Sequence, residues 1–184
     1  MKLVILDRDG VINEDSEDYI KSPVEWVPIP GSLEAIALLN NAGYTVAVAS
    51  NQSGLARGLF DIDALNRIHR RMMERLEAVG GRIDSIAFCP HGPQDRCPCR
   101  KPAPGLLLEL GHRYGVPLTD VPVIGDALRD VQAAACVGAA PILVRSGKGR
   151  DTACSLPPAL AAVPVVDDLR AAVALILKRQ PRCA

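Results

Sequence analysis

The sequence predicts an α/β fold in which a parallel β-sheet lies between two layers of helices. Short apolar runs at 3–6, 45–49 and 121–124 alternate with longer segments in which apolar residues recur at helical spacing. The runs lack the alternating polar residues of a half-exposed strand, which indicates strands that are buried on both faces. These two observations are typical of a doubly wound parallel sheet.

Length and composition set the broad class of the protein. The 184 residues, 48% of them hydrophobic, suffice for one domain with a substantial core, which we expect to span 1–184. The 21 Lys and Arg balance the 21 Asp and Glu, so no broad basic surface is available for nucleic acid or an anionic membrane. No stretch approaches the roughly 20 apolar residues of a membrane span, and no signal segment is visible. We therefore expect a cytoplasmic monomer that binds neither nucleic acid nor membrane.

The first predicted strand, 3–6, runs directly into Asp7-Arg8-Asp9-Gly10. Ligands of parallel α/β sheets bind beyond the carboxyl ends of the strands. In an extended chain Asp7 and Asp9 lie on the same side, while Arg8 points elsewhere. Two carboxylates this close repel each other unless a cation lies between them, and oxygen ligands suit Mg²⁺. An isolated Asp-x-Asp is more often a solvated turn, so the other strands must support this interpretation.

The segments after this strand continue the alternation. The polar stretch 13–30 is expected to form a flap or a short hairpin over the site. A helix is predicted to begin with Ser32 as its N-cap and to end at Gly43, and Asp61 begins a long amphipathic helix that Gly80 ends. The remaining predicted elements are a strand at 83–88, a helix at 104–114, a strand at 121–124, a helix through 135, a strand at 139–144 and a helix at 169–178.

Polar groups suited to phosphate chemistry follow several of these strands. Ser50 follows the second strand, Lys101 follows the loop after the third, and Asp126 follows the fourth, with Asp130 one helical turn later. Carboxylates can attack phosphorus and bind Mg²⁺, and a lysine can neutralise a phosphoryl group. Taken singly, Ser50 could be a helix cap, Lys101 a solvated cation and Asp130 a surface acid. Their conjunction with Asp7 favours a phosphate site.

A cysteine-rich loop follows the third strand. Its spacing, Cys-x-His-x₅-Cys-x-Cys, provides a complete tetrahedral set for Zn²⁺ in Cys89, His91, Cys97 and Cys99. Because no coordination position stays open, such an ion is structural. The alternative is a loop of reduced, unliganded thiols. The last ligand directly precedes Arg100 and Lys101, so the metal is expected to hold both cations toward the site.

The other three cysteines have ordinary interpretations. Cys136 is expected in the core, beside alanines near a helix end, and Cys154 and Cys183 at the surface.

The order of these motifs resembles a known superfamily. Asp7-Arg8-Asp9-Gly10-Val11, Ser50, Lys101 and Gly125-Asp126 are similar to the four motifs of the haloacid dehalogenase (HAD) phosphotransferases, over nearly the whole chain. The resemblance implies a Rossmann-like three-layer sandwich without a cap domain. It also implies that Asp7 forms an aspartyl phosphate and that Asp9 acts as general acid and then as general base. Mg²⁺ is then held by Asp7, the Asp9 backbone carbonyl and Asp126, while Ser50 and Lys101 hold the phosphoryl oxygens.

Two further stretches narrow the resemblance from the superfamily to one family within it. The zinc loop with the following Arg-Lys-Pro, and the run Ser-Asn-Gln-Ser-Gly-Leu-Ala-Arg-Gly at 50–58, are similar to the D-glycero-D-manno-heptose 1,7-bisphosphate 7-phosphatases. That resemblance implies hydrolysis of the 7-phosphate of this sugar bisphosphate, in the biosynthesis of lipopolysaccharide core precursors. It assigns to substrate binding Asp15, Tyr19, Ser50, Asn51, Gln52, Ser53, Arg100 and Lys101, with Arg57 as a weaker candidate.

Two departures and two alternatives accompany this interpretation. The stretch 13–19 differs from the Asp-His-Gly-Tyr form common in the family, and Ala127 stands where many members have Lys, which leaves the sugar anomer open. Histidinol-phosphate phosphatases share the zinc loop and are the alternative enzyme. The alternative of another class is a receiver domain, a signalling domain that accepts a phosphoryl group. Such a domain gives the zinc loop no role. Asp9, an acid–base group two residues from Asp7, favours an enzyme with rapid turnover over a receiver. The roles of Asp130 and of the basic loop 145–150 stay open.

Overall fold

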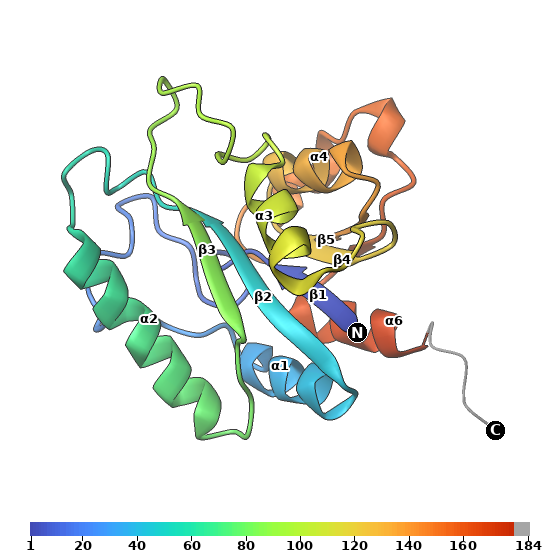
Figure 1. Cartoon of the computed structure of the whole chain (residues 1–184), viewed down its shortest axis with the longest axis horizontal. Helices are drawn as coiled ribbons and strands as arrows, with labels where there is room; N and C mark the ends of the chain where they lie inside the picture. The colour runs from blue at the N-terminus through green and yellow to red at the C-terminus, as the bar shows by residue number, and fades with distance from the viewer. Residues whose placement is uncertain (179–184) are drawn as a thin grey trace.

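The computed structural model describes residues 1–178. In this part of the chain, six parallel strands form one sheet in the order β3-β2-β1-β4-β5-β6 (Figure 1). The strands are β1 (Lys2–Leu6), β2 (Tyr44–Asn51), β3 (Ser85–Cys89), β4 (Pro122–Gly125), β5 (Ala140–Val144) and β6 (Val165–Val166).

Helices cover both faces of the sheet, as β1 illustrates. Val4 and Leu6 belong to one apolar cluster, together with residues of α1 (Ser32–Asn41), α2 (Ile62–Glu77) and α6 (Leu169–Lys178). Leu3 and Ile5 belong to a second cluster, which contains residues of α3 (Gly105–Tyr114) and α4 (Leu128–Cys136). Successive side chains of a strand point to opposite faces, so a strand buried on both faces is apolar throughout. The predicted α/β sandwich with a parallel central sheet is confirmed.

The termini of two helices show where local prediction succeeds and where it fails. The Asp61 carboxylate accepts a hydrogen bond from the Ala64 amide at 2.7 Å, so the predicted cap of α2 is confirmed. Ser32 does not cap α1, because its hydroxyl donates instead to the Ile12 carbonyl at 2.6 Å, and Gly31 is the N-cap with a φ of 81°. The Ser32 hydroxyl therefore ties α1 to the loop that follows β1.

Three short elements near the C-terminus were not predicted. These are α5 (Gly149–Cys154), a 3₁₀ turn (Pro158–Leu160) and β6, each too short to carry a periodic apolar signal. The expectation that Cys136 lies in the core is wrong, since its side chain is exposed at the end of α4. Cys154 is exposed as predicted, and Cys183 lies outside the described residues.

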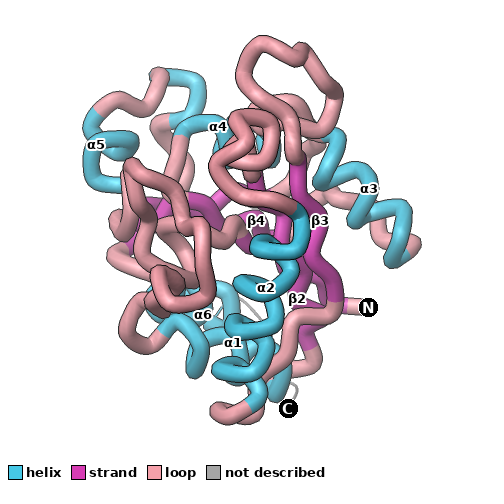
Figure 2. Tube along the Cα trace, turned by 90° about the vertical axis from the view of Figure 1, so that its left-hand side faces the viewer, coloured by secondary structure: helices cyan, strands magenta, loops and turns pink. Residues whose placement is uncertain are grey.

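The strand order locates the site. The chain leaves β1 toward β2 and β3 on one side of the sheet, and then crosses to β4 on the other side of β1. The carboxyl ends of β1 and β4 therefore border a topological switch point, where α/β folds bind their ligands. The loop after β3 continues beyond the end of this strand, as Figure 2 shows. The stretch 13–30 forms the other border and is held as a loop by an antiparallel bridge between Asn13 and Pro28.

Among the helices that residues 1–178 form, none combines the length and the apolar character that crossing a bilayer requires.

Candidate active site

The polar residues predicted from separate strands meet at one pocket beyond the carboxyl ends of β1 and β2. Of the predicted site residues, those that line the pocket are Asp7, Asp9, Asp15, Tyr19, Ser50, Asn51, Gln52, Ser53 and Arg100. Lys101 and Asp126 lie directly behind it, where Lys101 contacts Asp7 and Asp126 approaches both Asp7 and Asp130. The structure therefore gathers these residues from the end of β2 and from the segments that follow β1, β2, β3 and β4.

Lys101 is a buried ammonium group that is fully occupied by protein acceptors. Its Nζ lies 3.0 Å from Asp7 Oδ2 and 2.7 Å from Asp130 Oδ1, and it donates to the Ala49 carbonyl at 2.7 Å. Burial alone would lower the pKa of Lys101, but the charges of Asp130 and Asp7 outweigh it and raise the pKa. The alternatives of a solvated Lys101 and a surface Asp130 are therefore wrong.

The backbone of Lys101 is fixed by β2. The Asn51 side-chain amide donates to the Lys101 carbonyl at 3.0 Å and accepts from the Lys101 amide at 3.1 Å. This pair of bonds joins the end of β2 to the loop after β3. Asn51, which the family resemblance assigns to the substrate, thus has a role in placing Lys101.

Three buried carboxylates form an acidic cluster at the base of the pocket. Oxygens of Asp7, Asp126 and Asp130 lie within 4.8 Å of one another. Burial, which outweighs the charge of Lys101, raises the pKa of Asp7 to about 6. Burial, followed by the charges of Asp7 and Asp130, raises the pKa of Asp126 to about 7. The single ammonium group of Lys101 does not balance this negative charge.

One carboxylate oxygen of this cluster lacks a partner. Asp126 Oδ2 accepts from the Lys148 amide at 2.8 Å, while Asp126 Oδ1 is buried without a hydrogen bond. Buried polar atoms are normally satisfied, so this oxygen has a vacant acceptor position. Gly10 and Gly147 approach the same carboxylate closely, and a Cβ at either position would collide with it. The donor set is all oxygen, which fits a hard divalent cation such as Mg²⁺.

Asp9 lies in a cradle of donors. Its carboxylate accepts from Arg8 Nη2 at 2.8 and 2.9 Å, Arg8 Nε at 3.0 Å, Asn13 Nδ2 at 2.9 Å and Gln52 Nε2 at 3.0 Å. Burial would raise the pKa of Asp9, but the Arg8 charge and these hydrogen bonds lower it. These contacts therefore favour the ionised form of Asp9.

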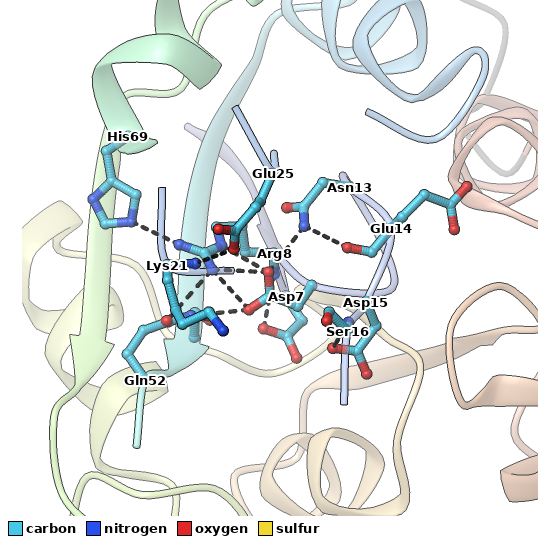
Figure 3. Close-up of polar contacts among 12 residues, drawn as sticks. Asp7, Arg8, Asn13, Glu14, Asp15, Ser16, Lys21, Glu25, Gln52 and His69 are labelled. Carbon is cyan, nitrogen blue, oxygen red and sulfur yellow. Dashed lines mark hydrogen bonds and ion pairs between the residues drawn. The ribbon is translucent and has the colours of Figure 1, made fainter. Parts of the chain in front are cut away.

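Arg8 itself corrects one prediction. Its side chain is only 1% exposed and forms an ion pair with Asp9 instead of pointing elsewhere. Figure 3 shows this side chain between Gln52 and His69. β1 ends at Leu6, so the strict alternation of an extended strand does not apply to Arg8. His69 Nε2 lies 3.4 Å from Arg8 Nη1, and burial, together with the Arg8 charge, lowers the pKa of His69 to about 4. His69 is a neutral packing residue of α2.

The loop after β1 and the basic loop after β5 meet across the pocket. Asp15 Oδ2 forms an ion pair with Lys148 Nζ at 2.9 Å, and the Ser146 hydroxyl donates to the Gly10 carbonyl at 2.6 Å. The basic loop 145–150 thus borders the site, a question that the sequence left open. Arg57 lies 5.7 Å from the centre of the Tyr19 ring and contacts that ring instead of lining the pocket.

Two pocket cations were not among the predicted site residues, although one of them, Lys148, belongs to the basic loop whose role the sequence left open. Lys148 and Arg129 both line the pocket. Burial would lower the pKa of Arg129, but the charges of Asp130, Asp7, Asp126 and Asp15 raise it, and its Nε is buried without a partner. The only sequence signal was the position of Arg129 in the first turn of the helix after Asp126, which does not distinguish it from a solvated surface residue.

The cysteine-rich loop brings its four predicted ligands together. Cys89 Sγ lies 3.5 Å from Cys97 Sγ and 3.2 Å from Cys99 Sγ, and Cys99 Sγ lies 3.4 Å from Cys97 Sγ. His91 Nδ1 lies 3.5 Å from Cys89 Sγ and 3.3 Å from Cys99 Sγ. A tetrahedron with sulfur about 2.3 Å from its centre has edges of roughly 3.8 Å, so a small expansion of this cluster accommodates Zn²⁺.

The zinc loop is coupled to the pocket through Arg100. Arg100 Nη1 donates to the carbonyl of His91 at 3.1 Å, and the Arg100 side chain also lines the pocket. Burial, followed by the hydrogen bond with Cys99, raises the pKa of Cys89 to about 12, an effect that a bound cation would oppose. Arg100 is thus held by the backbone of His91, so the conformation of the Cys₃His loop determines where the Arg100 side chain lies.

Sequence comparison identifies similar proteins. A HAD-hydrolase-like family model matches residues 98–172. The D-glycero-beta-D-manno-heptose-1,7-bisphosphate 7-phosphatase of Bordetella bronchiseptica is 58% identical over 152 residues, which cover 83% of this chain and 85% of the relative. The protein of the same name from Pseudomonas aeruginosa is 50% identical over 177 residues, which cover 96% of this chain and 98% of the relative.

Structural comparison agrees with these matches. The crystal structure of D,D-heptose 1,7-bisphosphate phosphatase from B. bronchiseptica, complexed with magnesium and phosphate, superposes with a TM-score of 0.93 at 52% identity, over 98% of this chain and 100% of that one. The crystal structure of the corresponding protein of Burkholderia thailandensis gives a TM-score of 0.76 at 46% identity, over 97% of this chain and 100% of that one.

Proposed function

Because the chain belongs to the D-glycero-β-D-manno-heptose-1,7-bisphosphate 7-phosphatases of the HAD-like hydrolases, we propose that it removes the 7-phosphate of that sugar bisphosphate during heptose precursor synthesis. It is a phosphatase whose substrate is a sugar phosphate. The observation that carries the proposal is the convergence of Asp7, Ser50, Lys101 and Asp126 on one pocket beside a Cys₃His cluster.

The positions of the side chains support a two-step transfer. Asp7 attacks phosphorus and a bond forms between its carboxylate and phosphorus. The bond to the 7-oxygen of the sugar breaks while Asp9, which has taken up a proton from solvent before this step, gives that proton to the oxygen. In the second step Asp9 takes a proton from a water molecule whose oxygen attacks phosphorus, and the bond to Asp7 breaks. Free phosphate and an unmodified Asp7 result. In both steps Ser50 holds a phosphoryl oxygen, and the positive charge of Lys101, whose Nζ lies 3.0 Å from Asp7 Oδ2, stabilises the transferring phosphoryl group.

Magnesium and zinc have separate places in this proposal. Asp7, the backbone carbonyl of Asp9 and Asp126 would hold Mg²⁺, which the vacant Oδ1 of Asp126 supports. When bound, Mg²⁺ neutralises charge that develops on the transferring phosphoryl group. The Cys₃His cluster of the loop after β3 would hold Zn²⁺ with all four positions filled, so that ion is structural.

The acidic cluster predicts an unusual pH dependence of stability in magnesium-free buffer. Asp7 and Asp126 have pKa values of about 6 and about 7 in the folded protein, against 3.8 for an ordinary aspartate. The folded state therefore binds more protons than the unfolded state between about pH 4 and pH 7, and the free energy of unfolding falls as the pH rises through this window. Urea unfolding at pH 5 and pH 7.5 measures this, with a difference on the order of a few kcal/mol.

Added Mg²⁺ should restore the free energy of unfolding that is lost as the pH rises. The ion offsets the charge of the ionised carboxylates, so it should raise the urea midpoint more at pH 7.5 than at pH 5. Asp9, whose pKa is lowered, affects stability only below about pH 4 and does not disturb the comparison. A magnesium-free midpoint that rises steadily from pH 5 to pH 7.5 would contradict the prediction.

Zinc removal is expected to lower activity by displacing Arg100 and Lys101. A misplacement of about 1 Å can cost roughly 10²-fold in rate, and a loss of this order in kcat is expected for zinc-depleted protein assayed with Mg²⁺ restored. Cys99→Ser should have a similar effect, whereas Cys154→Ser is the matched control because that thiol is exposed on α5. Full activity of zinc-free protein would refute the coupling.

A phosphate-release assay tests the function and separates the alternatives. The substrates to compare are the α and β anomers of D-glycero-D-manno-heptose 1,7-bisphosphate and histidinol phosphate, each with Mg²⁺. We expect multiple turnovers and the highest kcat/KM on a heptose bisphosphate. A preference for histidinol phosphate would refute the substrate while leaving the chemistry intact, and a single stoichiometric labelling without turnover would indicate a receiver-like domain.

A further inference from the structure

Gln52 lies just beyond the end of β2, with its side chain enclosed by polar groups. Its backbone amide donates to the Cys89 carbonyl at 2.7 Å, which continues the pairing of β2 with β3. The side chain is 3% exposed and contacts three residues of two motifs, Arg8 and Asp9 after β1 and Ser50 in β2. It is the group that connects the hydroxyl of Ser50 to the carboxylate of Asp9.

The partners of Gln52 fix the orientation of its amide. Arg8 can only donate hydrogen bonds, so the Gln52 oxygen Oε1 must face Arg8 Nη2, at 3.4 Å. The amide nitrogen Nε2 then faces Asp9 Oδ2 at 3.0 Å and Ser50 Oγ at 2.9 Å. Its two hydrogens are both used, one on each acceptor. A flipped amide would place an acceptor against the Asp9 carboxylate and is excluded.

This orientation determines what the Ser50 hydroxyl can do. Because Ser50 Oγ accepts a hydrogen bond from Gln52, its own hydrogen cannot point toward Gln52. The hydroxyl hydrogen is left to donate in another direction, and Ser50 lines the pocket in which the phosphoryl group is placed. A donor that is oriented before the reaction stabilises developing negative charge without reorganisation.

We propose that Gln52 is a positioning residue that fixes the Ser50 hydroxyl as a hydrogen-bond donor to the transferring phosphoryl group. The inference rests on the proposed function, which places the phosphoryl group next to Ser50. It differs from the substrate-binding role that the family resemblance assigns to Gln52. With both amide hydrogens occupied inside the protein, Gln52 has none to offer a sugar hydroxyl.

The test is a double-mutant cycle between Gln52 and Ser50. Gln52→Met keeps the approximate length of the side chain but removes both hydrogen-bonding groups, so the Ser50 hydroxyl is free to rotate. Gln52→Glu keeps the shape, but its carboxylate can only accept, so it should draw the Ser50 hydrogen away from the pocket. Gln132→Glu makes the same chemical change at an exposed position of α4 and is the matched control.

The expected result is a fall in kcat at unchanged KM. Removal of one donor to a developing oxyanion costs about 10²- to 10³-fold, so we expect about 10-fold for Gln52→Met and about 10²-fold for Gln52→Glu. In a Ser50→Ala background, where no hydroxyl remains to be oriented, Gln52→Met should lower kcat by less than about 3-fold. Gln132→Glu should leave kcat unchanged.

Two results would overturn the proposal. One is an equal loss of kcat from Gln52→Met with and without Ser50, which would mean that Gln52 acts independently of that hydroxyl. The other is a raised KM at unchanged kcat, which would make Gln52 a substrate contact. Thermal unfolding of each variant verifies the fold, and Gln52→Leu, which also lacks both hydrogen-bonding groups, carries the same comparison if Gln52→Met does not fold.

A failure of the proposed function is detected separately. The unchanged enzyme is first assayed on heptose 1,7-bisphosphate, and no turnover there refutes the proposed substrate. The mutant cycle itself requires only a phosphomonoester that the unchanged enzyme hydrolyses, so its outcome does not depend on which sugar is the natural one.

Discussion

Asp7→Asn is expected to abolish phosphatase activity, with a fall in kcat of at least about 10⁴-fold. The neutral amide is a poor nucleophile and cannot form the aspartyl phosphate, so the two-step route is lost instead of slowed. Steady-state phosphate release with saturating Mg²⁺ measures the loss. In addition, acid-quenched protein should retain labelled phosphate for the unchanged enzyme and not for the variant.

The fold should survive this substitution. Asp7 is one of three crowded, buried acids, and an amide of the same shape relieves part of their repulsion. Asp120→Asn is the matched control, since this aspartate is exposed and has a φ of 62°, a conformation that asparagine tolerates. Near-normal turnover by a folded Asp7→Asn protein would remove the basis of the proposed mechanism.

Lys101→Met is expected to lower both activity and stability. The substitution removes the ammonium group that contacts Asp7, Asp130 and the Ala49 carbonyl, and leaves two buried carboxylates without their ion-pair partner. Breaking a buried ion pair in this way costs about 3–5 kcal/mol. We expect a loss of that size in the free energy of unfolding at pH 7.5 without Mg²⁺, together with a fall of about 10³-fold in kcat.

A second variant separates the two effects. The double variant Lys101→Met/Asp130→Asn also lacks one of the two carboxylates that paired with Lys101. Relative to Lys101→Met, it should therefore regain part of the free energy of unfolding but none of the activity. The stability cost of Lys101→Met should also be smaller at pH 5 than at pH 7.5, because the raised pKa of Asp7 lets it take up a proton. A Lys101→Met protein as stable as the unchanged one would contradict the ion-pair interpretation.

The fold and the zinc loop could largely be predicted from local sequence. The apolar runs at the positions of β1, β2 and β5 are continuous because those strands are buried on both faces, so these strands can be predicted from consecutive residues alone. The Cys₃His set was equally accessible, because its ligands lie within one short loop and their spacing is itself the signal. Very short elements such as β6 carry no such signal.

The contacts inside the pocket could not be predicted in the same way. The inward turn of Arg8 depends on where β1 ends, and the place of Lys148 depends on a loop that returns across the sheet to Asp15. Arg129 was overlooked because its neighbours in sequence do not reveal that it also lies near Asp7 and Asp15, which follow β1. Each of these side chains has at least one partner that is distant in the chain.

The sequence by itself determined which chemical groups follow which strands, because buried strands and closely spaced metal ligands both show as patterns of consecutive residues. Only the tertiary structure decided how those groups face one another, such as Gln52 donating to both Ser50 and Asp9, or Lys101 lying between Asp7 and Asp130. The physical reason is that hydrogen-bond direction and charge balance depend on distances between segments, which the strand order fixes and the residue pattern does not.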